Sequence, residues 1–212
     1  MKQLTLLTLA AAMLAPLGAH AAVTYTTDAA FLAAAGPGVA FESFEVLGVS
    51  TATSRGYADV TFSCAGGPWC PGFFGNSSMT ADNGSQSLYF ASPSTVTFTF
   101  NSGITAFGIA IGGAGDVGAL TLAASLNNGD SANALTAYSS GSGFFSGNRQ
   151  YFGIMSSTAF TSITFTPTNS GDGIFFDSLS YKAVPEPSSM LLLGLGALGA
   201  FAARRKKAAR AS

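Results

Sequence analysis

The segment Thr95-Val96-Thr97-Phe98-Thr99-Phe100 alternates threonine with a large apolar residue. Successive side chains of a β-strand point to opposite faces, so this segment predicts a strand with one buried and one polar face. The same period of two returns at residues 107–111 and 162–166. Turn-forming clusters of Gly, Asn, Asp and Ser separate such runs, at residues 82–85, 112–116, 127–130, 140–143 and 169–173. This pattern predicts a mainly β domain, an antiparallel β-sandwich or jelly roll.

Residues 22–183 are long enough for one domain with a sizeable core. Of the 18 phenylalanines of the chain, 17 lie in this part, and burying even half of them would make a strong core. One stretch, residues 28–35, is expected to be helical, because it begins with the capping residue Asp28 and ends at Gly36-Pro37.

The formal net charge of -1 is the sum of three unlike segments. Residues 1–21 carry one basic side chain, residues 22–183 carry three basic and nine acidic ones, and residues 184–212 carry five basic and one acidic. An acidic domain with so few basic side chains lacks the electrostatic surface that binds phosphate backbones, so we expect no nucleic-acid partner. Its charge favours cations or neutral glycans.

The N-terminus has the features of a secretory signal peptide. Lys2 precedes a largely apolar run, and Ala19-His20-Ala21 places small residues at the two positions that signal peptidase reads. We expect export and cleavage after Ala21. The chain has one histidine, His20, which would leave with the signal. The mature protein would then have no imidazole to serve as a catalytic base or a metal ligand.

The C-terminus combines three features in order: Val184-Pro185-Glu186-Pro187, an apolar run over residues 190–203, and the basic cluster Arg204-Arg205-Lys206-Lys207. A Pro-x-Pro segment is extended and exposes its backbone. The apolar run is expected to form a single transmembrane helix, although it spans only roughly 21 Å of a hydrocarbon core of roughly 30 Å. The basic cluster would act as a stop-transfer signal and stay cytoplasmic. The alternative is a buried C-terminal helix of the domain.

These three features resemble the PEP-CTERM sorting signal of exported Gram-negative proteins. The resemblance implies that Val184, Pro185, Glu186 and Pro187 are recognised by an exosortase, a membrane-embedded thiol protease or transpeptidase. It also implies an inner-membrane tether during processing, followed by a place at the cell surface or in an exopolysaccharide-rich extracellular matrix such as that of a biofilm. The expected organisation is a signal peptide at 1–21, an exported β domain at 22–183 and the sorting signal at 184–212.

The exported domain also resembles the jelly-roll domains common in PEP-CTERM proteins, several of which are similar in fold to carbohydrate-binding modules. The segments that carry this resemblance are Phe41-Glu42-Ser43-Phe44-Glu45, Ser92-Pro93-Ser94-Thr95-Val96 and Phe176-Asp177-Ser178-Leu179-Ser180-Tyr181. A fold does not give a function, so the glycan ligand implied here is an expectation only.

Two cysteines in an exported chain, Cys64 and Cys70, are expected to form a disulfide. The bridge would hold a loop that contains Trp69 and is followed by Phe73 and Phe74. A rigid loop with exposed aromatic rings predicts a contact with sugar rings. The alternative is that these three rings fold back into the core.

Aspartates in the expected turns form a second candidate set. Carboxylates and backbone carbonyls suit Ca²⁺, so Asp116, Asp130 and Asp172 are candidate calcium ligands. The alternative is that these three residues, like Asp82 and Asp177, serve only to form turns. No other cofactor is expected.

Glu42 and Glu45 are the candidate carboxylate pair for glycoside hydrolysis. Their three-residue spacing would place them on opposite faces of a strand, which separates them. Since the mature chain also lacks histidine and a nucleophile elbow, we expect a binding or structural protein and not an enzyme. The alternative is a secreted carbohydrate-active enzyme that uses Asp or Glu carboxylates.

Overall fold

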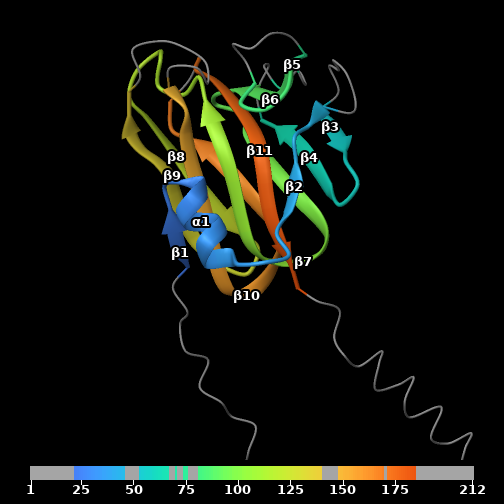
Figure 1. Cartoon of the computed structure of the whole chain (residues 1–212). Helices are drawn as coiled ribbons and strands as arrows, with labels where there is room; N and C mark the ends of the chain where they lie inside the picture. Colours follow the sequence, from blue (N-terminus) through green and yellow to red (C-terminus); the bar gives the residue numbers. More distant parts are fainter. Residues whose placement is uncertain are drawn as a thin grey trace, which may run out of the picture.

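The computed structural model describes residues 22–45, 53–66, 70, 74–75, 81–139, 148–169 and 171–184. In these residues the chain forms one helix and an antiparallel sheet of eleven strands (Figure 1). The elements are β1 (Val23–Tyr25), α1 (Asp28–Ala35), β2 (Ala40–Glu42), β3 (Ser54–Gly56), β4 (Val60–Ala65), β5 (Phe74–Gly75), β6 (Gln86–Ala91), β7 (Thr95–Gly112), β8 (Leu120–Leu126), β9 (Ser131–Tyr138), β10 (Gln150–Pro167) and β11 (Gly173–Ala183). The predicted mainly β, antiparallel class is confirmed, whereas the jelly roll stays a prediction.

The two longest strands, β7 and β10, have 18 residues each and pair with one another along most of their length. Their register shifts between Met155 and Ser162 of β10, opposite residues 99–106 of β7. On the N-terminal side of this register shift β7 pairs with β4, and on its C-terminal side β7 pairs with β11. The sheet therefore folds over on itself here, and we call residues 101–103 and 156–161 the folded edge. The opposite end, where β7 begins and ends, is the open end.

Four phenylalanines join the two halves of the folded sheet. Phe98 and Phe165 come from the half that contains β4 and β8, whereas Phe107 and Phe176 come from the half that contains β11. The Phe98 ring centroid lies 5.4 Å from that of Phe107, and the Phe165 centroid lies 4.9 Å from that of Phe176. All four side chains are buried. Aromatic pairs at these separations stabilise beyond the burial of their area, so this cluster holds the halves face to face.

Helix α1 covers the outer face of the half that contains β11. Its Phe31 is fully buried and packs with Ala106 of β7, whereas Ala110 farther along the strand packs with Phe175. The helix approaches closely because glycine lies beneath it: a Cβ at Gly153 would come within 2.7 Å of the Phe31 ring. The predicted helix over residues 28–35 is confirmed, but its N-cap is Thr27, whose hydroxyl accepts the Ala30 N–H at 3.3 Å. Asp28 is instead the first helical residue.

Replacing Phe98 by alanine should destabilise the protein by about 3–5 kcal/mol, because it removes a fully buried ring that touches both halves of the sheet. The neighbouring Thr99→Ala variant is the matched control, since Thr99 lies on the same strand with its side chain exposed. Urea denaturation of the purified protein measures both. Equal midpoints for the two variants would contradict the role given to the phenylalanine cluster.

Candidate functional site

The sorting segment leaves the domain directly from a central strand. β11 lies between β6 and β7 in the sheet, and its last residue is Ala183. The next residue, Val184, donates its N–H to the Gly103 carbonyl at 2.8 Å, at the folded edge. Pro185, Glu186 and Pro187, like the basic cluster at 204–207, lie outside the described residues. The chain thus passes from sheet to sorting segment without a linker.

Both ends of the β domain emerge at the folded edge. One row of paired residues crosses four neighbouring strands: Val23 pairs with Met155, Met155 with Ala106, and Ala106 with Lys182. Neighbouring strands are about 4.8 Å apart, so Val23 and Lys182 lie roughly 14 Å from each other. Figure 1 shows β1 and the end of β11 at the same end of the molecule. A chain that is anchored in a membrane through both ends would therefore carry the open end farthest from it.

Asp177 is a structural carboxylate inside β11. Its Oδ2 accepts the N–H groups of Asp82 and Asn83 at 2.7 and 2.9 Å, and its Oδ1 accepts the N–H of Ser178 at 2.6 Å. Ser178 has φ of 52°, and the pairing of β11 with β7 shifts register between Asp177 and Ser180. Burial raises the pKa of Asp177 to about 7, although the three N–H donors oppose this. The prediction that Asp177 is a turn residue is wrong, because it lies within a strand.

Asp82 connects this carboxylate to the surface. Its carboxylate accepts a hydrogen bond from the Ser178 hydroxyl at 2.7 Å and forms a bidentate ion pair with Arg149. The same guanidinium contacts Asp28 at 3.3 Å and lies over the Tyr151 ring, 5.8 Å from its centroid. The group holds the turn before β6, the start of β10 and helix α1 together. No sequence spacing marks it, since its members come from distant parts of the chain.

Glu42 and Glu45, the candidate carboxylate pair, bind backbone N–H groups in two different loops. β2 ends at Glu42, whose carboxylate accepts the Phe44 N–H at 2.7 Å. Glu45 lies beyond the strand and binds the N–H groups of Ser85 and Gln86 at 2.8 and 2.6 Å. The prediction that both lie in one strand on opposite faces is wrong, because Phe44, with φ of 61°, turns the chain out of the strand. Both carboxylates fix loop backbone instead.

The three aspartates predicted as calcium ligands do not come together. Asp172 precedes β11 at the open end, and its carboxylate faces that of Asp116. Asp130 lies in the turn after β8, where Asn128 binds Ser156 and the Thr158 carbonyl of the folded edge. Since β8 has seven residues, the two ends are roughly 20 Å apart. Within the part of the chain that the structure describes, no group of three or more His, Cys, Asp or Glu side chains is placed to hold a metal.

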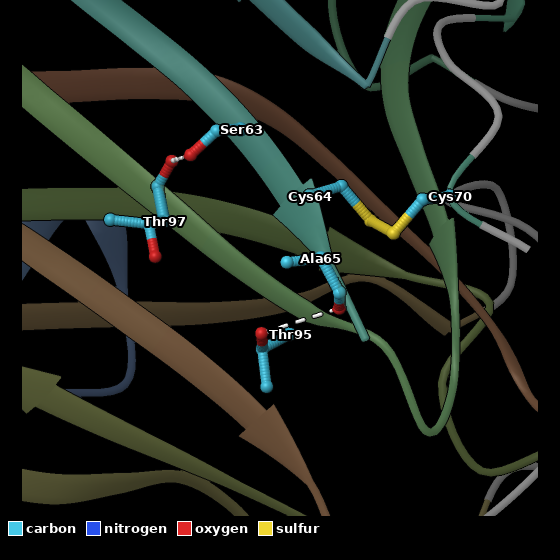
Figure 2. The surroundings of a disulfide bond; sticks show 6 residues. All are labelled: Ser63, Cys64, Ala65, Cys70, Thr95 and Thr97. Atoms are coloured by element: carbon cyan, nitrogen blue, oxygen red, sulfur yellow. Dashed lines mark hydrogen bonds between the residues drawn. A yellow bond between two sulfur atoms is a disulfide. The ribbon is translucent and has the colours of Figure 1, made fainter. Parts of the chain in front are cut away.

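The predicted disulfide between Cys64 and Cys70 is present, and both cysteines are buried (Figure 2). It lies at the open end, where Cys64 pairs with Val96 near the start of β7. Figure 2 shows two side chains that tie the same strands together: the Thr95 hydroxyl donates to the Ala65 carbonyl, and the Ser63 hydroxyl donates to the Thr97 carbonyl. The bridge therefore anchors its loop to β4, which pairs with β7 along its whole length.

The aromatic residues predicted to touch glycans are only partly described. Trp69 and Phe73 lie outside the described residues, and the structure describes only the backbone of Phe74, which pairs with Ser87 as part of β5. Their role in glycan binding stays a prediction. The two cysteines nevertheless fix both ends of the Trp69 loop at the open end.

Comparison with protein families gives one match. Residues 183–206 match the model of the PEP-CTERM protein-sorting motif. The chain carries a PEP-CTERM sorting motif. The match begins at the last residue of β11, and it confirms the sorting signal predicted from Val184, Pro185, Glu186 and Pro187. The motif supports an exported protein that is sorted by an exosortase and anchored in the membrane during sorting.

The membrane-spanning part of the PEP-CTERM signal is not tested by the structure. Among the residues described, none belongs to a helix with the length and apolarity needed to cross a membrane. The predicted transmembrane run, residues 190–203, lies outside them.

Neither of the other comparisons gives this chain a function. No curated protein matches the chain. Among solved structures, the enzymatically active domain of tailspike protein 4 from bacteriophage CBA120 is similar over 70% of this chain, with 12% identity and a TM-score of 0.33. The alignment covers 20% of that chain.

The buried carboxyls of the β domain predict a pH dependence of stability. Burial raises the pKa of Asp177 to about 7 and that of Asp172 to about 6, above the value near 4 of an unfolded chain. Between about pH 4 and 7 the folded protein therefore holds protons that the unfolded chain has lost, so stability falls as the pH rises. We expect the Tm to be about 4–8 °C higher at pH 4.5 than at pH 7.5 in the presence of a chelator.

The control for this pH dependence is Asp177→Asn, which cannot titrate. Its Tm should vary less between the two pH values, whatever its absolute stability. An unchanged difference would assign the pH dependence to other groups, and a Tm that rises with pH in the wild type would contradict the prediction.

Proposed function

We propose that residues 22–183 are a binding or structural component of the cell surface or extracellular matrix, delivered there by an exosortase, and that exopolysaccharide is the ligand. The observation that carries this proposal is the PEP-CTERM motif joined without a linker to β11. Because β11 is a central strand, the exosortase acts on a tail whose attached domain is already complete. The product of sorting is then a folded β domain outside the cell.

The placement of the chain ends supports a ligand site at the open end. Both ends of the domain emerge at the folded edge, so the membrane lies on that side during processing. The disulfide that anchors the Trp69 loop lies at the open end, where Cys64 pairs with Val96, roughly 17 Å along β7 from residue 101 of the folded edge. An aromatic loop there would meet matrix polysaccharide while the chain is still tethered.

The carboxylates of the domain support binding in preference to catalysis. Asp177 and Glu45 are each bound to two or more backbone N–H groups, and Asp82 is paired with Arg149. Carboxylates held in this way stabilise loops, whereas a glycosidase needs a pair of carboxyls that faces a substrate. We therefore propose that the protein is not an enzyme. The acidic charge of the domain also disfavours polyanions and favours neutral glycans.

Sorting is tested by changing Pro185, Glu186 and Pro187 to alanine and measuring the intact mass and location of the protein in its native host. The wild type should lose the tail near residue 185 and leave the membrane fraction. The alanine variant should keep the mass of the uncleaved tail and remain membrane-bound. A matched control changes Ser188 and Ser189, which directly follow Pro187, to alanine. Wild-type protein that retains Arg204 to Ser212 outside the cell would overturn the proposal.

Glycan binding is tested by Trp69→Ala, with titration calorimetry against exopolysaccharide purified from the host. Loss of a stacking tryptophan should weaken binding about tenfold or more. Phe41→Ala is the matched control, since Phe41 is an aromatic side chain that is 55% exposed on β2, away from the disulfide. Equal affinities of the wild type and Trp69→Ala would remove this loop from the site. Release of reducing ends in the same mixtures would instead favour the carbohydrate-active enzyme.

A further inference from the structure

Two carboxylates, those of Asp116 and Asp172, face each other at the open end of the sheet. Asp172 is fully buried, and its side chain is within hydrogen-bonding contact of the Asp116 carboxylate. Asp116 itself is exposed, in the loop between β7 and β8. Two ionised carboxylates repel each other, so such a pair needs either a shared proton or a cation.

Asp172 is held in one orientation by bonds on every other polar atom. Its N–H donates to the Ser92 hydroxyl at 3.0 Å, and its carbonyl accepts the Ser92 N–H at 2.9 Å. Its Oδ2 accepts the Gly115 N–H at 2.7 Å, and the Asn169 amide lies 3.5 Å from the same atom. These bonds fix the direction of Oδ1 and keep the side chain from rotating toward solvent.

Two buried oxygens in this cluster lack any hydrogen-bond partner. They are Oδ1 of Asp172 and Oδ1 of Asn169. The Asn169 amide nitrogen is turned toward Asp172, which leaves its oxygen free to bind something else. Buried oxygens are almost always satisfied, and two unpaired oxygens beside the Asp116 carboxylate indicate a missing electropositive ligand.

We propose that Asp116, Asp172 and Asn169 bind one divalent cation, and that the cation is Ca²⁺. Two carboxylates and an amide carbonyl are hard oxygen donors, and Ca²⁺ takes six to eight of these, with waters and backbone carbonyls completing the set. The exposed Asp116 gives the ion access from solvent. Neither Lys nor Arg is among the partners given above for Asp172, so the ion supplies the positive charge that the pair lacks.

The unpaired Asn169 oxygen separates the ion from a shared proton. A proton shared between the two carboxylates would leave Oδ1 of Asn169 without a partner, whereas a cation would take this oxygen as a ligand together with both carboxylates.

Calcium at this position would join three segments of the open end: the loop after β7, the turn before β11, and the turn at Ser92 that precedes β7. The disulfide anchors its loop at the same end. The proposed ion is independent of the proposed glycan ligand, and either can fail without the other.

The test is calorimetric titration of Ca²⁺ into the chelator-stripped full chain in detergent at pH 7.5, with thermal melts alongside. The wild type should bind one ion per chain with a Kd of roughly 0.1–1 mM, typical of extracellular sites. At 5 mM Ca²⁺ its Tm should rise by about 2–8 °C. Asp116→Asn should weaken binding at least tenfold, because it removes one of two charged ligands at an exposed position. Asp130→Asn is the matched control, a turn aspartate at the folded edge, and should bind as the wild type does.

A second variant keeps the test informative if Asp116→Asn folds poorly. Asn169→Asp adds a third carboxylate, so it should lower the Tm in chelator and enlarge the rise on adding Ca²⁺. Absence of a calcium-dependent Tm shift in the wild type, or wild-type affinity in Asp116→Asn, would overturn the proposal. Equal losses in Asp116→Asn and Asp130→Asn would overturn it as well, because they would indicate a nonspecific charge effect.

Discussion

The structure depends on the contact between four phenylalanine rings across a sheet that folds over on itself. β7 and β10 contribute to both halves, so the two halves share their longest strands. Phe98, Phe107, Phe165 and Phe176 fill the space that this folding creates. Pairing of distant segments must occur before these rings gain from burial, and this makes the domain a single cooperative unit.

The folded sheet also divides the molecule into two ends with different tasks. β1 lies at the folded edge, and Val184 leaves β11 there for the PEP-CTERM segment, so both ends of the domain lie on one side. The open end gathers the disulfide and the Asp116–Asp172 pair. Sequence-distant loops meet there only because β7 both begins and ends at that end. Under the proposed function, this separation keeps contacts with the matrix away from the tethered ends.

The carboxylates illustrate how an acidic domain with few basic residues stabilises its loops. Glu45 binds two N–H groups and the hydroxyl of Ser85, and Asp177 binds three N–H groups. Backbone N–H groups bind these carboxylates in place of Lys and Arg side chains, of which the domain has few. Such bonds satisfy loop backbone that no strand partner reaches, and they do so without the desolvation cost of a buried lysine or arginine.

Local chemistry let the sequence determine the strand at Thr95–Phe100, helix α1, the disulfide and the PEP-CTERM motif, because each depends on residues close together in the chain. Alternation, capping, export and a Pro-Glu-Pro element before an apolar run need no knowledge of the fold. The position of Asp177 inside a strand and the end of β2 at Glu42 depend on register with distant partners, and so the sequence misplaced them. Asp116, Asp130 and Asp172 look alike in sequence, each beside a glycine in a turn. Only the tertiary structure decided which of them meet. The folding over of β7 and β10 brings Asp116 and Asp172 together at the open end. Asp130 lies at the folded edge, because the seven residues of β8 separate its turn from the loop of Asp116.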